Sequence, residues 1–164
     1  MSTITLRHPE LRDAETFYAI LSNPNFVYFD IKPKSLHDEK VWLMTNPERR
    51  KKNHEHNYAI LCDGKPVGGC GIKISQHKPH TGEIGYFLDE SHWGKGITSR
   101  AVTLLEEIGF NELQLTHIEI VMDVRNKASE MVAIKCGYTK KRMIRKAVLT
   151  KENILDCYLY VKVR

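Results

Sequence analysis

Residues 83–100 read EIGYFLDESHWGKGITSR, and this is the most informative stretch of the chain. Its first part, 83–88, has the composition of a strand, and a long helix is predicted from Gly96 to Phe110. The apolar residues of that helix recur at the spacing of one face: Ile97, Ala101, Leu104, Leu105 and Ile108. A strand that turns into an amphipathic helix predicts an α/β protein in which helices cover a sheet.

The Gly-x-Gly turn between this strand and helix is suited to phosphate. The first amides of a helix have no internal partner, and the helix dipole is positive at that end. Gly94 and Gly96 let the backbone approach a pyrophosphate, and Thr98 and Ser99 add hydroxyl donors. The Walker pattern is absent, and Ser99 breaks the GxGxxG fingerprint. Taken alone, the motif leaves open a tight turn that binds nothing.

The rest of the chain supplies the other elements of the predicted sheet. A strand at 3–7 precedes a helix with Ala14, Phe17, Tyr18 and Leu21 on one face, and Asn23-Pro24 ends that helix. A second helix is predicted from Ser35 to about Met44. Strands are predicted at 58–62, 67–75, 83–88 and 118–124, with Asp63-Gly64 as a hairpin turn. Asn126 caps a short helix that ends before Gly137, and two strands close the chain.

The predicted order is therefore β-α-α-β-β-β-α-β-α-β-β, in a single domain that spans 1–164. Adjacent hairpin strands in the middle predict an α/β protein of the α+β type, with a mixed, largely antiparallel sheet of about seven strands and about four helices. The chain of 164 residues is long enough for a core of its own.

Composition excludes several classes of protein. No apolar run approaches the ~20 residues that span a bilayer, and the N-terminal residues lack a signal peptide, so we expect a cytoplasmic protein and no membrane partner. The net charge of +5 suits an anionic ligand but does not by itself predict nucleic-acid binding, which is not expected. The polar run PERRKKNHEHN at 47–57 is interpreted as a solvated loop or helix end, with a contact for RNA or an acidic partner as the alternative.

Histidine and cysteine spacing argues against a metal site. His54, His56, His77 and His80 lie in polar segments, and with Cys62 and Cys70 they match no common zinc spacing. Cys136 and Cys157 are likewise interpreted as reduced thiols, and Cys136 as a small core residue rather than a nucleophile.

The motifs resemble those of the GNAT N-acetyltransferase superfamily, in particular the branch that acetylates the N-terminal alanine or serine of ribosomal proteins. IGYFLDESHWGKGITSRAV is similar to the IGY-x-L-x-x-x-x-x-G-x-G signature of that branch. RNKAS resembles its N-x-x-S helix start, KCGY its Gly-aromatic ending, and TLRHPELRDAETFYAIL its opening strand and helix. The resemblance covers nearly the whole chain and implies a GNAT-like fold with acetyl-CoA as co-substrate and no metal.

The resemblance also implies where acetyl-CoA binds. The cofactor is expected where the strands at 83–88 and 116–124 splay apart, with the pantetheine arm on the backbone near Phe87 and Leu88. The pyrophosphate is expected on the amides of Trp93, Gly94, Lys95, Gly96, Ile97, Thr98 and Ser99, and Asn126 is expected to contact the pantetheine arm. Ser91 replaces the Gln or Arg that many members place before the first glycine, which weakens a side-chain contact to phosphate.

Two residues are predicted to be catalytic. Ser129 matches the serine that protonates the leaving thiolate in this family, although a serine in a first helical turn needs no such role. Glu83 matches a region where some members place a general base, although an exposed carboxylate at a strand end is the alternative. The predicted reaction is direct attack of a primary amine on the thioester, without a covalent enzyme intermediate.

The acceptor is left open between a small-molecule amine and a protein N-terminus, and a homodimer is also left open. Lys140, Lys141, Arg142, Arg145 and Lys146 make the strand after Gly137 basic, which disfavours a basic ribosomal peptide and favours an acceptor with a carboxylate or phosphate. Acceptor specificity is expected in loops at about 23–34 and 46–57. A non-catalytic coenzyme A-binding or regulatory module and an RNA-associated protein are the alternatives.

Overall fold

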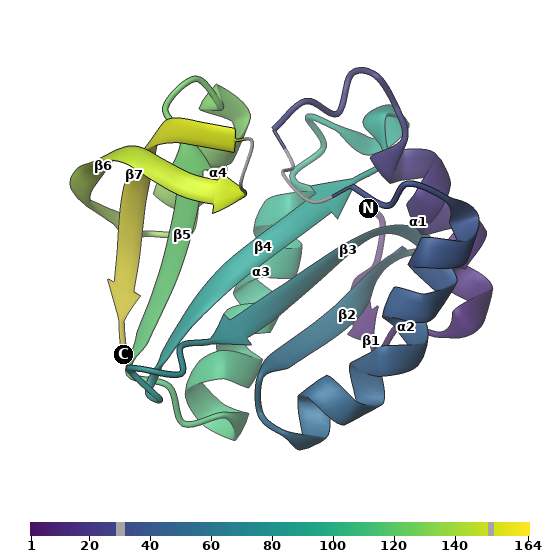
Figure 1. Ribbon diagram of the computed structural model, residues 1–164, viewed down its shortest axis with the longest axis horizontal. Helices are drawn as coiled ribbons and strands as arrows, with labels where there is room; N and C mark the ends of the chain where they lie inside the picture. The colour runs from purple at the N-terminus through teal and green to yellow at the C-terminus, as the bar shows by residue number, and fades with distance from the viewer. Residues whose placement is uncertain (29–31, 151–152) are drawn as a thin grey trace.

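Seven strands form one mixed sheet in the order β1-β2-β3-β4-β5-β7-β6 (Figure 1). The computed structural model describes residues 1–28, 32–150 and 153–164. The strands are β1 (Ile4–Arg7), β2 (Glu55–Cys62), β3 (Lys65–Ile74), β4 (Thr81–Leu88), β5 (His117–Asp123), β6 (Thr139–Thr150) and β7 (Asn153–Val163). This order, the largely antiparallel pairing and four flanking α-helices confirm the predicted fold class.

Helices cover both faces of the sheet. On one face, α1 (Ala14–Leu21) and α2 (Leu36–Lys51) pack over an apolar cluster that includes Phe17, Leu43 and Phe87. On the other face, α3 (Ile97–Glu107) and α4 (Lys127–Lys135) contribute Leu105 and Ala133 to a larger core. Successive side chains of a strand point to alternate faces of the sheet, as in β2, where Ala59 joins the first cluster and Ile60 the second. Three short turns are η1 (Leu11–Asp13), η2 (Glu90–His92) and η3 (Ile108–Glu112).

The pair β4 and β5 departs from the rest of the sheet. It is the parallel pair, and its register runs only from Thr81↔His117 to Glu83↔Glu119. Beyond that point β4 continues to Leu88 and β5 to Asp123, but the two strands no longer pair with each other. They diverge toward one end of the sheet (Figure 1). The predicted splay is thereby confirmed, and it opens the sheet between β4 and the region of α4.

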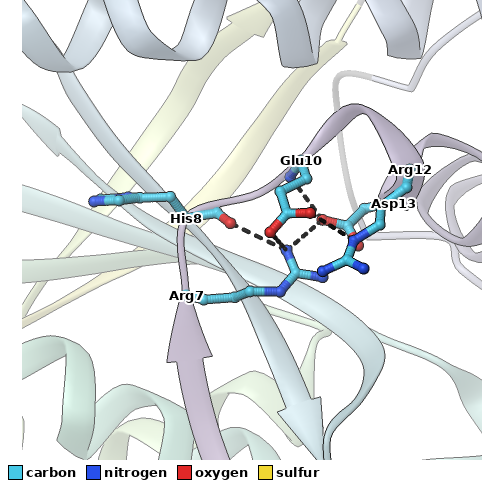
Figure 2. A network of polar contacts seen from close by, with 5 residues as sticks. All are labelled: Arg7, His8, Glu10, Arg12 and Asp13. Atoms are coloured by element: carbon cyan, nitrogen blue, oxygen red, sulfur yellow. Dashed lines mark hydrogen bonds and ion pairs between the residues drawn. The ribbon is translucent and has the colours of Figure 1, made fainter.

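A buried ion pair holds the junction between β1 and α1 (Figure 2). Both terminal nitrogens of Arg7 donate to the Asp13 carboxylate at 2.7 Å, and the amide of Glu10 donates to the same carboxylate at 2.7 Å. Asp13 is 1% exposed. Burial alone would raise the pKa of Asp13, but these hydrogen bonds outweigh it and hold the pKa below its ordinary value.

The polar run at 47–57 consists of a helix end, as one of its two interpretations predicted, followed by a short turn and the start of a strand. Helix α2 continues through Pro47 to Lys51, and β2 already begins at Glu55, so the prediction of a helix ending near Met44 is wrong. Proline interrupts helices because it lacks an amide donor. Here the turn before Pro47 is reinforced, because the side chains of Thr45, Asn46 and Arg49 all donate to the carbonyl of Trp42.

Smaller differences occur at the ends of other elements. Helix α3 ends at Glu107, and the predicted continuation to Phe110 is instead the five-residue π turn η3. In β7 the side chains of Cys157, Leu159 and Val161 are buried, whereas Val163 is exposed. Of the predicted acceptor loop at 23–34, residues 29–31 lie outside the described residues.

Candidate functional site

A pocket of about 440 Å³ lies where β4 and β5 diverge. Its wall combines the end of β4, the turn before α3, the start of α4 and the segment after α1. Ten of the predicted cofactor and catalytic residues line it: Phe87, Leu88, Trp93, Gly94, Gly96, Ile97, Thr98, Ser99, Asn126 and Ser129. Lys95 and Glu83 do not line it. Residues far apart in sequence thus form one cavity large enough for part of a cofactor.

The turn before α3 needs glycine because of its backbone angles. Gly94 has φ +73° and Gly96 has φ +75°, in the left-handed region where other residues are strained. A Cβ built on either glycine would meet no protein atom within 4 Å, so the constraint that the structure itself imposes is conformational. Among the described residues no side chain caps the start of α3, which leaves its amides available at the pocket wall.

Side chains around the turn hold it in place. The indole nitrogen of Trp93 donates to the carbonyl of Leu88 at 2.8 Å, across the strand-to-helix connection. Asp89 accepts from the amide of Ser91 at 2.8 Å and from its hydroxyl at 2.6 Å, so Ser91 stabilises the turn. Lys95 folds back to donate to the carbonyl of Ser91, which accounts for its absence from the pocket wall.

Ser129 is joined to a residue that sequence reasoning did not identify. Its Oγ lies 2.6 Å from the hydroxyl of Tyr86, which projects from β4. The side chain of Asn126 accepts from the Ser129 amide at 3.1 Å, which confirms the predicted cap and fixes the first turn of α4. Burial raises the pKa of Tyr86 to about 12, so its hydroxyl keeps its proton at neutral pH. The IGY pattern of β4 contained the signal for Tyr86, since alternation puts it on the face of α4.

The segment after α1 is held over the pocket at two places. The amide groups of Asn23 and Asn25 donate to the Glu90 carboxylate at 2.8 and 3.0 Å. The Tyr28 hydroxyl lies 3.4 Å from the carbonyl of Arg125, beside the start of α4. Residues 25–28 contribute to the pocket wall between these two points. Their sequence contains no motif, and only their contacts across more than 60 residues of chain reveal this position.

Glu83 lies in the paired part of β4, one step before the strands diverge. Its partners in register are Lys73 of β3 and Glu119 of β5. Although Glu83 is exposed, the flanking strands reduce the hydration of its carboxyl group and raise its pKa. Lys73 opposes this effect and Glu119 adds to it. Glu83 and Ser129 are therefore not brought together in one wall of the pocket.

The basic strand β6 lies at the edge of the sheet, and its first lysine is engaged. The ammonium of Lys140 lies 2.7 Å from Glu130 and 3.7 Å above the Tyr158 ring. Glu130 also accepts from Lys127 and Tyr160, and these hydrogen bonds lower its pKa to about 2. Lys140 is thus held by α4 and β7 rather than offered to an anionic acceptor.

Neither a metal site nor a membrane span is supported by the described part of the chain. No group of three or more His, Cys, Asp or Glu side chains there could hold a metal ion. His56 is buried and its ring lies 2.7 Å from the Asn53 side chain. Within the same residues, no helix is long and apolar enough to cross a membrane.

Comparisons with known proteins agree with this geometry. Residues 3–139 match the model of the acetyltransferase (GNAT) domain. The uncharacterized protein YkkB of Bacillus subtilis is 34% identical over 148 residues, which cover 87% of this chain and 86% of YkkB. The ribosomal-protein-serine acetyltransferase of Escherichia coli is 26% identical, covering 87% of this chain and 76% of that enzyme. The microcin C7 self-immunity acetyltransferase MccE, solved with acetyl-CoA and AMP, superposes with a TM-score of 0.86 at 26% identity, over 98% of this chain and 92% of MccE.

The pocket fits the cofactor of this family. Amides at an uncapped helix start suit a pyrophosphate, and the unpaired edge of β4 suits an amide-containing arm such as pantetheine. The half-buried Ser129–Tyr86 hydroxyl pair lies in the same pocket wall. This chain belongs to the GNAT acetyltransferase family, and it is an acetyl-CoA-dependent N-acetyltransferase.

Proposed function

We propose that this protein acetylates a primary amine with Ser129 as proton donor and Glu83 as proton acceptor. The observation that carries the assignment is the 2.6 Å contact between Ser129 Oγ and the Tyr86 hydroxyl in the pocket wall. Acetyl-CoA, when bound, supplies the thioester that the amine attacks. The amides from Trp93 to Ser99 would hold its pyrophosphate, and the backbone of Phe87 and Leu88 its pantetheine arm.

Ser129 can deliver a proton because the Tyr86 hydroxyl can donate a hydrogen bond to the serine oxygen as that oxygen gains negative charge. A serine hydroxyl is a weak acid, and it becomes a better donor when a second hydroxyl compensates the developing charge. Tyr86 suits this task since its raised pKa keeps it protonated. The Asn126 cap sets the position of Ser129 by holding its amide. Leaving-group protonation thus depends on three side chains from β4 and α4.

Glu83 is proposed to remove the proton of the amine, directly or through water. Most primary amines are protonated at neutral pH, and a general base adds roughly 100-fold or more to such a reaction. The reduced hydration of its carboxyl group between the flanking strands raises the pKa of Glu83, which makes its carboxylate a stronger base than an ordinary glutamate. Because Glu83 lies outside the pocket wall, the acceptor is expected to enter from the α1 and α2 side of the sheet.

The acceptor is proposed to be a small-molecule amine or a protein N-terminus. The relative from E. coli acts, by its name, on the serine of a ribosomal protein, and this supports the second choice. We further propose that residues 1–164 act as one domain, since all seven strands share one sheet. A cytoplasmic location is proposed because Cys62, Cys70 and Cys136 are free thiols.

A panel of amines tests the proposal. Wild-type protein and Ser129→Ala are incubated with acetyl-CoA and spermidine, L-phenylalanine or a peptide that begins with serine. Free thiol and acetylated amine are both quantified, and equal amounts of the two demonstrate transfer. We expect one acceptor class to react with the wild type and to slow at least 10-fold with Ser129→Ala at unchanged acetyl-CoA affinity. Thiol release that is independent of every amine would reject the proposed transfer.

A further inference from the structure

A line of charged residues crosses one face of the sheet and ends at the point where β4 and β5 diverge. The register places Glu55 opposite Lys73, Lys73 opposite Glu83, and Glu83 opposite Glu119. Residues directly opposite one another project to the same face. Arg49 of α2 continues the line, with its Nη1 3.5 Å from the Glu55 carboxylate. The signs therefore alternate from Arg49 to Glu83, and Glu119 then repeats the negative charge.

The two carboxylates at the end of this line lack a contact ion pair among the described residues. Among the ion pairs of the described residues, none includes Glu83 or Glu119, whereas Glu55 is paired with Arg49. Like charges directly opposite each other are unfavourable in a sheet. The negative charge of Glu119 therefore disfavours the charged form of Glu83 and raises the pKa of Glu83. Glu83 and Glu119 also form the last register pair before β4 and β5 diverge. In the proposed reaction the amine loses its proton near this point.

We propose that Glu119 is a positioning residue that makes Glu83 a better proton acceptor, and that the acceptor amine binds as its ammonium ion at the end of this charged line. The inference rests on the proposed role of Glu83 as the base. It also makes a cation the expected class of acceptor, because a positive charge beside Glu119 restores the alternation of charge signs that Glu119 interrupts. The expectation of an acidic acceptor rested on five basic residues of β6, of which Lys140 is engaged by Glu130.

The proton transfer is balanced within this arrangement. An N–H bond of the ammonium breaks, its electron pair stays on nitrogen, and an O–H bond forms on the Glu83 carboxylate. Before the transfer, Glu83 and Glu119 are both negative; afterwards only Glu119 is. The transfer thus removes one like-charge repulsion, and this raises the proton affinity of Glu83. Lys73 on the opposite flank acts in the other direction, and Glu55 and Arg49 lie farther along the line.

Carboxyl titration by 13C NMR tests the coupling without any acceptor. The protein is labelled at glutamate side-chain carboxyl carbons, and the Glu83 resonance is assigned from its absence in Glu83→Gln. We expect Glu119→Gln to lower the Glu83 titration midpoint by about 0.5 to 1 pH unit and Lys73→Met to raise it by a similar amount. Glu107→Gln, an exposed change on α3, is the matched control and should leave the midpoint in place. An unchanged midpoint in Glu119→Gln overturns the inference.

Kinetics then separates this inference from the role of Glu83 itself. With the best acceptor of the amine panel, the acidic limb of kcat/KM should move to lower pH in Glu119→Gln and disappear in Glu83→Gln. In the Glu83→Gln background, Glu119→Gln should have no further effect on the profile. If Glu83→Gln removes the limb while Glu119→Gln moves neither limb nor midpoint, the inference alone is wrong. If Glu83→Gln overlays the wild type, the proposed base is wrong and the inference falls with it.

Discussion

Ser129→Ala is the most direct perturbation of the proposed chemistry. It removes a 2.6 Å contact to Tyr86, whose hydroxyl is then left, among the described residues, with the Ser129 carbonyl at 3.5 Å, too long for a good hydrogen bond. A net hydrogen bond is worth about 0.5 to 1.5 kcal/mol, so the free energy of unfolding should fall by about 1 kcal/mol. The rate should fall much further, by about 10- to 1000-fold in kcat, because water replaces a positioned acid poorly.

Tyr86→Phe distinguishes a catalytic role of the contact between Tyr86 and Ser129 from a purely structural one. If Tyr86 acts only through Ser129, its loss should reduce kcat about 2- to 10-fold, the equivalent of one hydrogen bond. The double variant should then be no slower than Ser129→Ala, because the second change removes a partner of a missing group.

Thiol release under saturating acetyl-CoA measures kcat, and calorimetry measures cofactor affinity in each variant. Acetyl-CoA affinity should change little, because leaving-group protonation matters chiefly in the transition state. Wild-type kcat in Ser129→Ala would return Ser129 to a structural place in the first turn of α4. Additive losses in the double variant would show that Tyr86 contributes by a separate route.

Three further outcomes follow from the structure. Gly96→Ala should lose about 1 kcal/mol of stability and at least 10-fold in acetyl-CoA affinity, as measured by urea unfolding and calorimetry. The control Gly64→Ala, with a similar φ of +80° in a distant turn, should lose only the stability. If Gly96→Ala binds acetyl-CoA as tightly as Gly64→Ala does, the turn is not part of the cofactor site. Asp13→Asn should lower the unfolding free energy by about 2 to 4 kcal/mol at pH 7. Because the folded pKa of Asp13 is depressed, that difference should shrink as pH falls below about 4, and urea unfolding at pH 7 and pH 3 measures it. Burial raises the pKa of Glu39 to about 7, so the stability of the wild type should fall between about pH 4.5 and 7, where the unfolded chain has released this proton and the folded chain has not. Glu39→Gln should lose that pH dependence and be roughly 1 to 3 kcal/mol more stable than the wild type at pH 8. Wild type and variant whose unfolding free energies, measured in urea, change with pH in parallel would reject the assignment.

Local sequence signals were sufficient wherever one element carried its own pattern. The hairpin turn at Asp63-Gly64, the cap at Asn126 and the apolar face of α3 are all encoded within a few residues, and the structure contains each of them. The helix predicted to end near Met44 continues to Lys51, where side chains of Asn46 and Arg49 donate to the carbonyl of Trp42. Propensity describes a residue alone, whereas these contacts depend on its neighbours.

The sequence by itself determined the order of the elements, the glycine turn and the serine at the start of α4, since each depends on local backbone geometry. Tertiary structure alone decided that Tyr86 contacts Ser129, that the segment after α1 joins Glu90 and Arg125, and that Glu83 faces Glu119. Those contacts join residues more than 30 positions apart, and their formation depends on strand register and on the divergence of β4 from β5. Register is a property of two strands together, so no single stretch of sequence contains it.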